Sequence, residues 1–199
     1  GHTRTTSLFL KMEKPYTRSS GWAATFAYTY SDAKTTSKEW KNDIFDWTYG
    51  RPGVRGFNPS TEVDKHRLVA AGVFDNLLPL GLQLSYKATL ASGFPHRVTS
   101  CAAGWDKCVS VEGNGTAFRQ VDIGLSREFK LMGQSVELRA DVLNLFNTTS
   151  YDGFDDFVGA PPAAGNPANR LGGDNLNLDK PNSLRGDSRT FRLAVIYRF

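Results

Sequence analysis

Residues 191–199 read FRLAVIYRF and carry an apolar or aromatic side chain at every second position. These alternate residues are Phe191, Leu193, Val195, Tyr197 and Phe199, and between them lie Arg192, Ala194, Ile196 and Arg198. Successive side chains of a β-strand point to opposite faces, so this spacing gives a strand one continuous apolar face. The stretch therefore predicts a β-strand.

The same alternation recurs along the chain and predicts about seven long strands. The six earlier runs are residues 3–14, 21–33, 64–75, 81–93, 118–131 and 135–147. Each run is near the ~10 residues that a tilted strand needs to cross a membrane. In the third run the segment LVAAGVF is apolar on both faces, so the register of that strand stays open.

The connections between these runs alternate between short and long. The short ones are residues 14–20, 76–81 and 131–134, and the long ones are residues 34–61, 94–116 and 150–187. This rhythm predicts an up-and-down meander with all long loops at one end. Compact soluble domains rarely carry several loops longer than ~15 residues, whereas bacterial outer-membrane barrels combine short periplasmic turns with long extracellular loops.

Alternation alone does not separate a membrane barrel from a soluble sheet, because both have one apolar and one polar face. Strand length, loop rhythm and aromatic residues toward the strand ends favour the barrel. Those aromatic residues are Trp22, Tyr28, Tyr30, Phe129, Phe146, Tyr197 and Phe199. The predicted fold class is all-β: an antiparallel up-and-down transmembrane β-barrel segment.

Composition excludes other classes of protein. The net charge is +4 and the basic residues are scattered, whereas nucleic-acid-binding proteins usually show a basic stripe. No stretch approaches the ~18 consecutive apolar residues of a transmembrane helix. Aromatic residues make up 12% of the chain and there are 19 glycines, a mixture that favours β-structure with many turns.

Residues 118–151 read FRQVDIGLSREFKLMGQSVELRADVLNLFNTTSY and include a strand that ends in Asn-Leu-Phe-Asn, Asn144 to Asn147. They resemble the penultimate hairpin of TonB-dependent outer-membrane receptors, in which such a strand precedes the last extracellular loop. Residues 63–95 resemble an earlier hairpin, which an Asp and His pair opens, here Asp64 and His66. A Pro-x-Gly turn follows at residues 79–81, and the rising strand ends in Ser-Gly-aromatic-Pro at residues 92–95.

The resemblance extends to the last strand and to the long loops. Residues Phe191, Leu193, Val195, Tyr197 and Phe199 match the outer-membrane β-signal that the barrel-assembly machinery recognises in that family. The long loops are similar to those of the Oar-like branch. The family fold has about 22 strands and an N-terminal plug, so residues 1–199 would supply about the last seven strands, without the plug domain and the earlier strands.

The resemblance implies TonB-dependent uptake of a siderophore, glycan, peptide or similar substrate across the bacterial outer membrane. The implied partners are outer-membrane lipid, the rest of the barrel and the plug, and TonB itself through the absent N-terminal part. Two alternatives stay open: a structural or adhesive outer-membrane barrel that does not import, and a secreted β-sandwich that binds carbohydrate. No nucleic-acid partner, no enzyme activity and no cofactor is expected.

The sequence offers few candidate site residues and no catalytic constellation, since His2, His66 and His96 are far apart. Cys101 and Cys108 are expected to form a disulfide that closes a short loop. Aromatic residues of the long loops either contact a ligand or pack the loops together. These are Trp40, Phe45, Trp47, Tyr49 and Trp105.

The remaining charged residues can be explained without a bound ligand. The loop carboxylates Asp152, Asp155, Asp156, Asp174 and Asp179 are either solvated turns or Ca²⁺ ligands. The tripeptide at residues 185–187, Arg-Gly-Asp, is a chance match to an adhesion motif. Charge ladders between neighbouring strands are expected on the polar face. Their members are Asp122, Glu137, Arg139, Asp141, Arg192 and Arg198.

Overall fold

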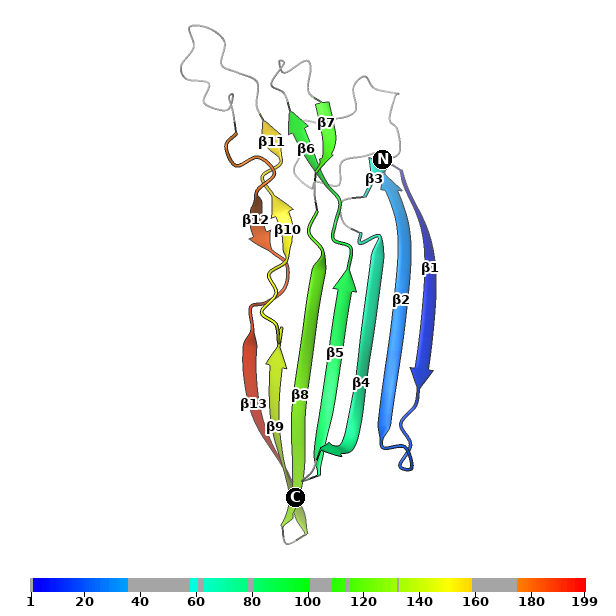
Figure 1. Cartoon of the computed structure of the whole chain (residues 1–199), viewed down its shortest axis with the longest axis vertical. Helices are drawn as coiled ribbons and strands as arrows, with labels where there is room; N and C mark the ends of the chain where they lie inside the picture. The colour runs from blue at the N-terminus through cyan, green and yellow to red at the C-terminus, as the bar shows by residue number, and fades with distance from the viewer. Residues whose placement is uncertain are drawn as a thin grey trace, which may run out of the picture.

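Seven long antiparallel strands lie side by side in chain order (Figure 1). The computed structural model describes residues 2–35, 58–60, 63–78, 81–100, 109–113, 115–131, 133–158 and 175–199, and in these the chain is all β. The long strands are β1 (Thr3–Lys14), β2 (Trp22–Thr35), β4 (His66–Leu78), β5 (Leu82–Ala91), β8 (Phe118–Leu131), β9 (Gln134–Leu143) and β13 (Thr190–Arg198). Among the described residues, no helix has the length and apolarity needed to cross a membrane.

The predicted meander is confirmed, and two strand ends differ from the expected ones by three or more residues. β4 continues three residues beyond the predicted end at Asp75, with an irregularity in its pairing between Asp75 and Leu78. β9 ends at Leu143, four residues before the predicted end, because Asn144 takes a left-handed backbone conformation with φ of 51°. A strand requires negative φ, so the ladder stops at Leu143.

Short strands lie above the long ones in Figure 1, in segments that the sequence pattern predicts only as loops. They are β6 (His96–Ser100), β7 (Val109–Gly113), β10 (Tyr151–Phe154), β11 (Phe157–Val158) and β12 (Pro181–Leu184), while β3 (Asn58–Pro59) pairs with the end of β2. β10 pairs with β12, and β6 pairs antiparallel with β7 and parallel with β11. Runs this short carry too little periodicity to be recognised in a sequence.

The register gives the main sheet two chemically distinct faces. Every cross-strand pair places alternate apolar residues of all seven strands on the same side, which we call the apolar face. Its members include Leu8, Leu10, Met12, Trp22, Phe26, Tyr28, Leu68, Phe74, Leu84, Tyr86, Ile123, Leu125, Leu138, Val142, Leu193 and Val195. The opposite, polar face includes Ser7, Glu13, Thr25, Ser31, Arg67, Gln83, Lys87, Asp122, Ser126, Glu137, Arg139, Asp141, Arg192 and Arg198.

Pairing also fixes the strand whose register the sequence leaves open. Phe26 of β2 pairs with Ala70, and Tyr28 pairs with Leu68, so the even-numbered residues of β4 lie on the apolar face. Val69 and Val73 consequently lie on the polar face, opposite Thr89 and Ser85 of β5.

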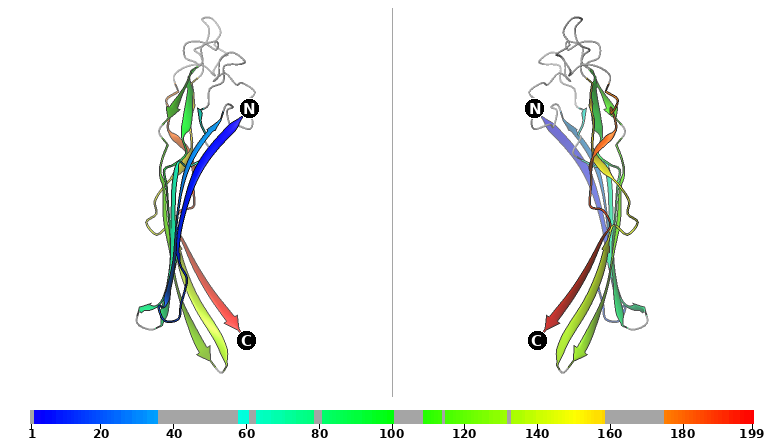
Figure 2. Two further views of the ribbon diagram at one scale, coloured as in Figure 1. Left: turned by 90° about the vertical axis from the view of Figure 1, so that its right-hand side faces the viewer. Right: turned by 90° about the vertical axis from the view of Figure 1, so that its left-hand side faces the viewer.

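Nothing in the described part of the chain covers the apolar face. Figure 2 shows the sheet from its edges as one curved and twisted layer of strands. The buried hydrophobic residues are only Ala33, Ala91, Val98 and Phe154 in the described residues. The accessible surface is 13610 Å², whereas about 9,300 Å² is expected for a compact monomer of 22.0 kDa. A single layer cannot bury its own apolar face, so this face needs a partner outside the described chain.

Aromatic side chains gather at both ends of the apolar face. Figure 1 shows that β2 begins at the lower end of the sheet. There Trp22, the first residue of β2, stacks on the Phe74 ring, which also stacks on Tyr86, with centroids 6.1 and 5.9 Å away. At the upper end, His66 stacks on Tyr28 at 6.2 Å and accepts or donates a hydrogen bond at Nδ1 to the Tyr28 hydroxyl at 2.8 Å. Between these groups the face is apolar, and apart from Phe26 of β2 its side chains are mostly aliphatic.

Glycine at position 72 makes the lower aromatic stack possible. Gly72 pairs with Tyr86, and a Cβ there would lie 2.6 Å from Cε1 of the Tyr86 ring and 2.7 Å from the Ala23 carbonyl oxygen. The Tyr86 ring therefore lies across the backbone of β4, in space that any larger residue would occupy. Aromatic rings covering a strand glycine stabilise such positions in designed sheets.

The turn between β1 and β2 is tied to the lower end of β4 by a tyrosine. The Tyr16 hydroxyl donates a 2.5 Å hydrogen bond to Oδ2 of Asp75, whose Oδ1 accepts a bond from Gln83. The bond to Asp75 raises the pKa of Tyr16 above its ordinary value, with smaller contributions from desolvation and from the Asp75 charge. A raised tyrosine pKa means that the contact is complete below the ordinary pKa of about 10 and is lost as the pH rises through the raised value.

We therefore expect Tyr16 to ionise at a higher pH than a free tyrosine. The measurement is an absorbance titration near 295 nm of the intact protein, from which the titration of Tyr16→Phe is subtracted to isolate Tyr16. In the Asp75→Asn background the same difference curve should move back toward the ordinary tyrosine pKa. An unchanged midpoint in that background would show that Asp75 is not the cause.

Candidate functional site

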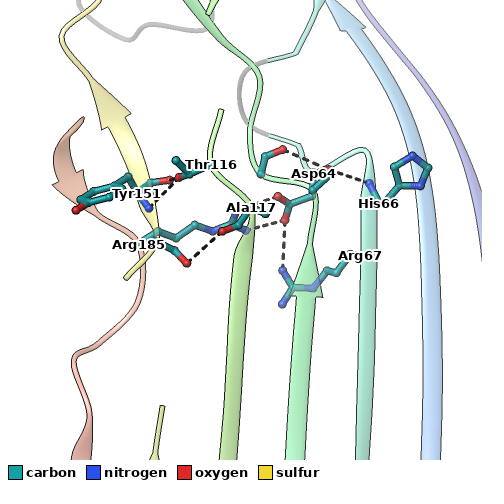
Figure 3. A network of polar contacts seen from close by, with 10 residues as sticks. Asp64, His66, Arg67, Thr116, Ala117, Tyr151 and Arg185 are labelled. Atoms are coloured by element: carbon teal, nitrogen blue, oxygen red, sulfur yellow. Dashed lines mark hydrogen bonds and ion pairs between the residues drawn. The ribbon is translucent and has the colours of Figure 1, made fainter. Parts of the chain in front are cut away.

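A largely buried ion pair lies at the upper junction, where the long strands end and the short strands begin. Arg185 donates from Nη1 to Oδ1 of Asp64 at 2.8 Å and from Nη2 to Oδ2 at 2.6 Å (Figure 3). The side chains of Arg185 and Asp64 are only 13% and 6% exposed. Arg67 contributes a weaker contact, 3.6 Å from Oδ2 of Asp64, and is itself half exposed. Two-pronged pairing of this kind fixes both position and orientation.

Aromatic rings complete the surroundings of the Arg185 guanidinium. Its central carbon lies 3.9 Å from the centroid of Phe94 and 4.9 Å from that of Phe118. Guanidinium groups are attracted to ring faces, and the attraction grows as water is excluded. Arg185, 121 residues after Asp64, thus joins the segment following β12 to the start of β4 and to the ends of β5 and β8.

Backbone and hydroxyl contacts hold the same segments together around this pair. The Arg185 amide donates to the Ser150 carbonyl at 2.9 Å, and the Ser150 hydroxyl donates to the Ala117 carbonyl at 3.3 Å. The Thr116 hydroxyl accepts from the Tyr151 amide at 3.1 Å and donates to the Tyr151 carbonyl at 3.0 Å. The junction is therefore a continuous set of contacts, as Figure 3 shows, and not one isolated ion pair.

Two sequence motifs singled out above meet at this junction. The His66 amide donates to the Ser92 hydroxyl at 3.1 Å, and the Ser92 amide donates to the His66 carbonyl at 2.9 Å. The next residue, Gly93, has φ of 89°, and a Cβ there would collide with the carbonyl oxygen of Thr116. The Ser-Gly-aromatic-Pro stretch thus places Phe94 against Arg185, and the Asp and His pair supplies the carboxylate.

The Asn-Leu-Phe-Asn stretch forms the turn that leads out of β9. The Asn144 side chain is among the most buried polar groups described, with 4% of the residue exposed. Its Nδ2 donates to the carbonyls of Thr148 and Asp187, each at 3.0 Å, and its Oδ1 accepts from the Thr148 amide at 2.9 Å. Asn147, which also has φ of 51°, accepts from the Arg189 amide at 3.1 Å. The two asparagines thus hold the turn after β9 against the segment that leads from Arg185 into β13.

We expect Asn144→Ala to destabilise this turn by about 2–3 kcal/mol, because three side-chain hydrogen bonds worth about 1 kcal/mol each are lost. Amide hydrogen exchange of the intact protein should show the loss first at Thr148. Asn144→Gly tolerates the left-handed backbone but also loses the bonds, so it separates the two contributions. Phe146→Ala is the matched control, since Phe146 is 68% exposed in the same turn. Equal exchange rates in all variants would contradict the assigned role.

A second contact outside the main sheet joins β6 to the segment before β12. His96 Nε2 lies 2.6 Å from Oδ1 of Asp179, and the His96 ring stacks on Phe154 with centroids 4.1 Å apart. The other ring nitrogen, Nδ1, is buried and has no hydrogen-bond partner among the described residues. Asp179 itself has φ of 61°, so its backbone departs from an extended course where its side chain meets the histidine.

The predicted charge ladders on the polar face are present in part. Arg198 Nη2 pairs across strands with Oε2 of Glu137 at 2.8 Å. Arg139 instead pairs within its own strand, from Nε to Oδ1 of Asp141 at 2.9 Å. Asp122 is used differently, because its Oδ1 accepts from the Asn144 amide at 2.8 Å and so caps the end of β9.

Several expected site residues lie outside the described residues. These are Cys101 and Cys108, expected to form a disulfide, and the loop aromatics Trp40, Phe45, Trp47, Tyr49 and Trp105. The expected β-signal residues are described: Phe191, Leu193, Val195 and Tyr197 lie in β13 on the apolar face, and Phe199 follows the strand. Among the described residues, no group of three or more histidine, cysteine or acidic side chains is placed to hold a metal ion.

The loop carboxylates that suggested Ca²⁺ are engaged with protein groups where they are described. Asp152 accepts from Ser183, Asp155 accepts from Asn175, and Asp179 contacts His96. Arg185 of the Arg-Gly-Asp tripeptide is buried against Asp64, so it is not displayed as an adhesion motif would require. Sequence reasoning noticed Arg185 only in that tripeptide and missed its role. No local sequence pattern predicts a partner so distant in the chain.

No protein-family model, curated protein or solved structure matches this chain.

Proposed function

We propose that this chain forms part of the wall of an outer-membrane β-barrel, with its apolar face against lipid and its polar face toward the lumen. The observation that carries the proposal is the uncovered apolar face, which extends across all seven long strands and has aromatic groups at both ends. Soluble monomers rarely expose apolar patches beyond a few hundred Å². A bilayer is the solvent in which such a face is stable.

Strand dimensions support the same environment. The long strands have 9 to 14 residues. Ten residues rising about 3.3 Å each and tilted by about 40° span a height of about 25 Å, which matches the apolar band of outer-membrane barrels. The amphipathic rings of Trp22, Tyr28, Tyr30 and Tyr197 are suited to the two interfaces between hydrocarbon and water. The apolar side chains between them suit the hydrocarbon.

The finer proposal is a TonB-dependent receptor that takes up a substrate such as a siderophore, glycan or peptide. It is supported by the resemblance of the motifs. Asp64 with His66 and residues 92–95 meet at the upper junction, and Asn144 to Asn147 hold the neighbouring turn to the segment that carries Arg185. In this role the junction holds the segments above the strands in fixed positions at the mouth of the lumen. Its partners would be the plug, the remaining strands and TonB.

The test uses the whole gene product, expressed in a Gram-negative host. We expect it in the outer-membrane fraction, resistant to extraction with carbonate, and floating with lipid vesicles after purification. Recovery in the aqueous phase without detergent would overturn the barrel proposal and favour a secreted sheet protein. Uptake of candidate substrates is then compared in hosts with and without TonB. Uptake that persists when TonB is deleted would overturn the receptor proposal but not the barrel proposal.

A further inference from the structure

A groove on the apolar face runs between β8, β9 and β13 near their lower ends. It has a volume of about 450 Å³ and is lined chiefly by apolar side chains, including Leu125, Phe129, Leu138, Leu193 and Val195. Leu125 and Leu138 come from neighbouring strands, and Leu193 pairs with Ala140 next to Leu138. The groove is open to the surface and mainly apolar, which suits a hydrocarbon chain.

One cation interrupts the apolar series of β8 at this groove. Arg127 follows Val121, Ile123 and Leu125 at alternate positions and pairs with Leu138, so it belongs to the apolar face. Its guanidinium carbon lies 4.7 Å from the centroid of Phe129, the next apolar-face residue toward the lower turn. The side chain thus extends its aliphatic stem along the groove and its charge toward the end of the strands, as arginine does at membrane interfaces.

The donors of Arg127 are unused within the described chain. Arg127 makes no hydrogen bond or ion pair with any described residue, although its guanidinium has five N–H donors. Lys14 offers a contrast at the same end of the apolar face. Its ammonium lies 4.1 Å from the Trp22 ring centroid and donates to the Ser20 hydroxyl at 2.8 Å and to the Trp22 carbonyl at 3.0 Å. Lys14 is satisfied by its own turn, whereas Arg127 requires an acceptor from outside.

We propose that this groove binds an anionic phospholipid, with the phosphate on Arg127 and one acyl chain along Leu125, Leu138 and Leu193. The inference rests on the proposed function, since it requires the apolar face to meet lipid. Guanidinium pairs with phosphate oxygens through two parallel hydrogen bonds. Phe129 lies beside the charge, and Tyr197 lies level with Phe129 on the other side of β9, where the head groups of one leaflet would meet the aromatic residues.

The experiment measures lipid selectivity of the intact protein by native mass spectrometry from detergent micelles. Equal amounts of phosphatidylglycerol and phosphatidylcholine with identical acyl chains are added, and the ratio of the two bound lipids is recorded. We expect the anionic lipid to be preferred, and Arg127→Gln to reduce the preference by about fivefold, the effect of one cation at a membrane surface. Excess inorganic phosphate should not displace the lipid, because it lacks the chain that fills the groove.

Matched variants distinguish this site from a non-specific attraction of anionic lipid to basic residues of the protein. Lys14→Met removes the satisfied cation, and Arg119→Gln removes an exposed cation from the opposite end of β8. Both should retain the wild-type preference. An equal loss in all three variants, or no loss in Arg127→Gln, would overturn the lipid site. Flotation of the same wild-type preparation with vesicles separates the two proposals: floating protein without lipid preference overturns the site alone, and protein that does not float overturns both.

Discussion

Replacing Asp64 with alanine should cost the intact protein about 3–5 kcal/mol of stability at the upper junction. The variant leaves the guanidinium of Arg185 buried between Phe94 and Phe118 without its carboxylate. A buried charge that loses its partner carries the full cost of its removal from water, which is why such changes are among the most severe. The loss should appear as faster hydrogen exchange at the amides of Arg185 and Tyr151, and as a lower urea midpoint in micelles.

Two comparisons make the result specific to the buried pair. Arg67 touches the same carboxylate at 3.6 Å but is half exposed, so Arg67→Gln should cost about 1 kcal/mol or less. Combining Asp64→Asn with Arg185→Leu removes both charges, and it should recover most of the stability lost on removing Asp64 alone. If the double variant is as unstable as Asp64→Ala, charge burial is not the cause and the loss reflects packing.

Replacing Leu193 with arginine should destabilise the membrane-embedded protein by about 2–4 kcal/mol. Leu193 lies on the apolar face of β13, where 87% of the residue is exposed in the isolated chain. Arginine facing lipid near the middle of the bilayer carries a cost of this size. If the face met water instead, a charged residue at so exposed a position would change stability by about 0.5 kcal/mol or less.

Ile196→Arg on the same strand is the matched control. Ile196 lies on the polar face opposite Glu137, so an arginine there gains an acidic neighbour and avoids lipid. The measurement is equilibrium unfolding of both variants in lipid vesicles, with the folded fraction followed by tryptophan fluorescence. A large loss for Leu193→Arg with a small one for Ile196→Arg is the expected result. Equal effects would mean that the two faces do not differ in environment, and the barrel proposal would fall.

The long strands could be predicted because their signal is local and repeated. In β1 and β8 the alternating residues mark the two faces, and the predicted and observed bounds coincide. The lower turns follow from residues such as Gly21 and Gly133, which adopt positive φ. The register of β4 could not be predicted from LVAAGVF, since both faces are apolar, and the pairing with β2 and β5 decides it.

The upper junction lies beyond what local patterns determine. Asp64 and Asn144 belong to motifs that are visible in the sequence. Their partners, Arg185 and the Asp187 carbonyl, come from a distant segment. The short strands likewise form through contacts between segments far apart in the chain, as in the pairing of β11 with β6. Such contacts depend on tertiary structure and produce no periodic pattern in the sequence.

The odd number of long strands restricts how the sheet can be closed. In a meander each strand runs opposite to its neighbour, so in a sheet of seven the two outermost strands, β1 and β13, run in the same direction. They could meet each other only as a parallel pair. A closed wall that is antiparallel throughout needs an even total, and it must therefore add an odd number of strands between β13 and β1. Whatever completes this sheet has to enter and leave it from opposite ends.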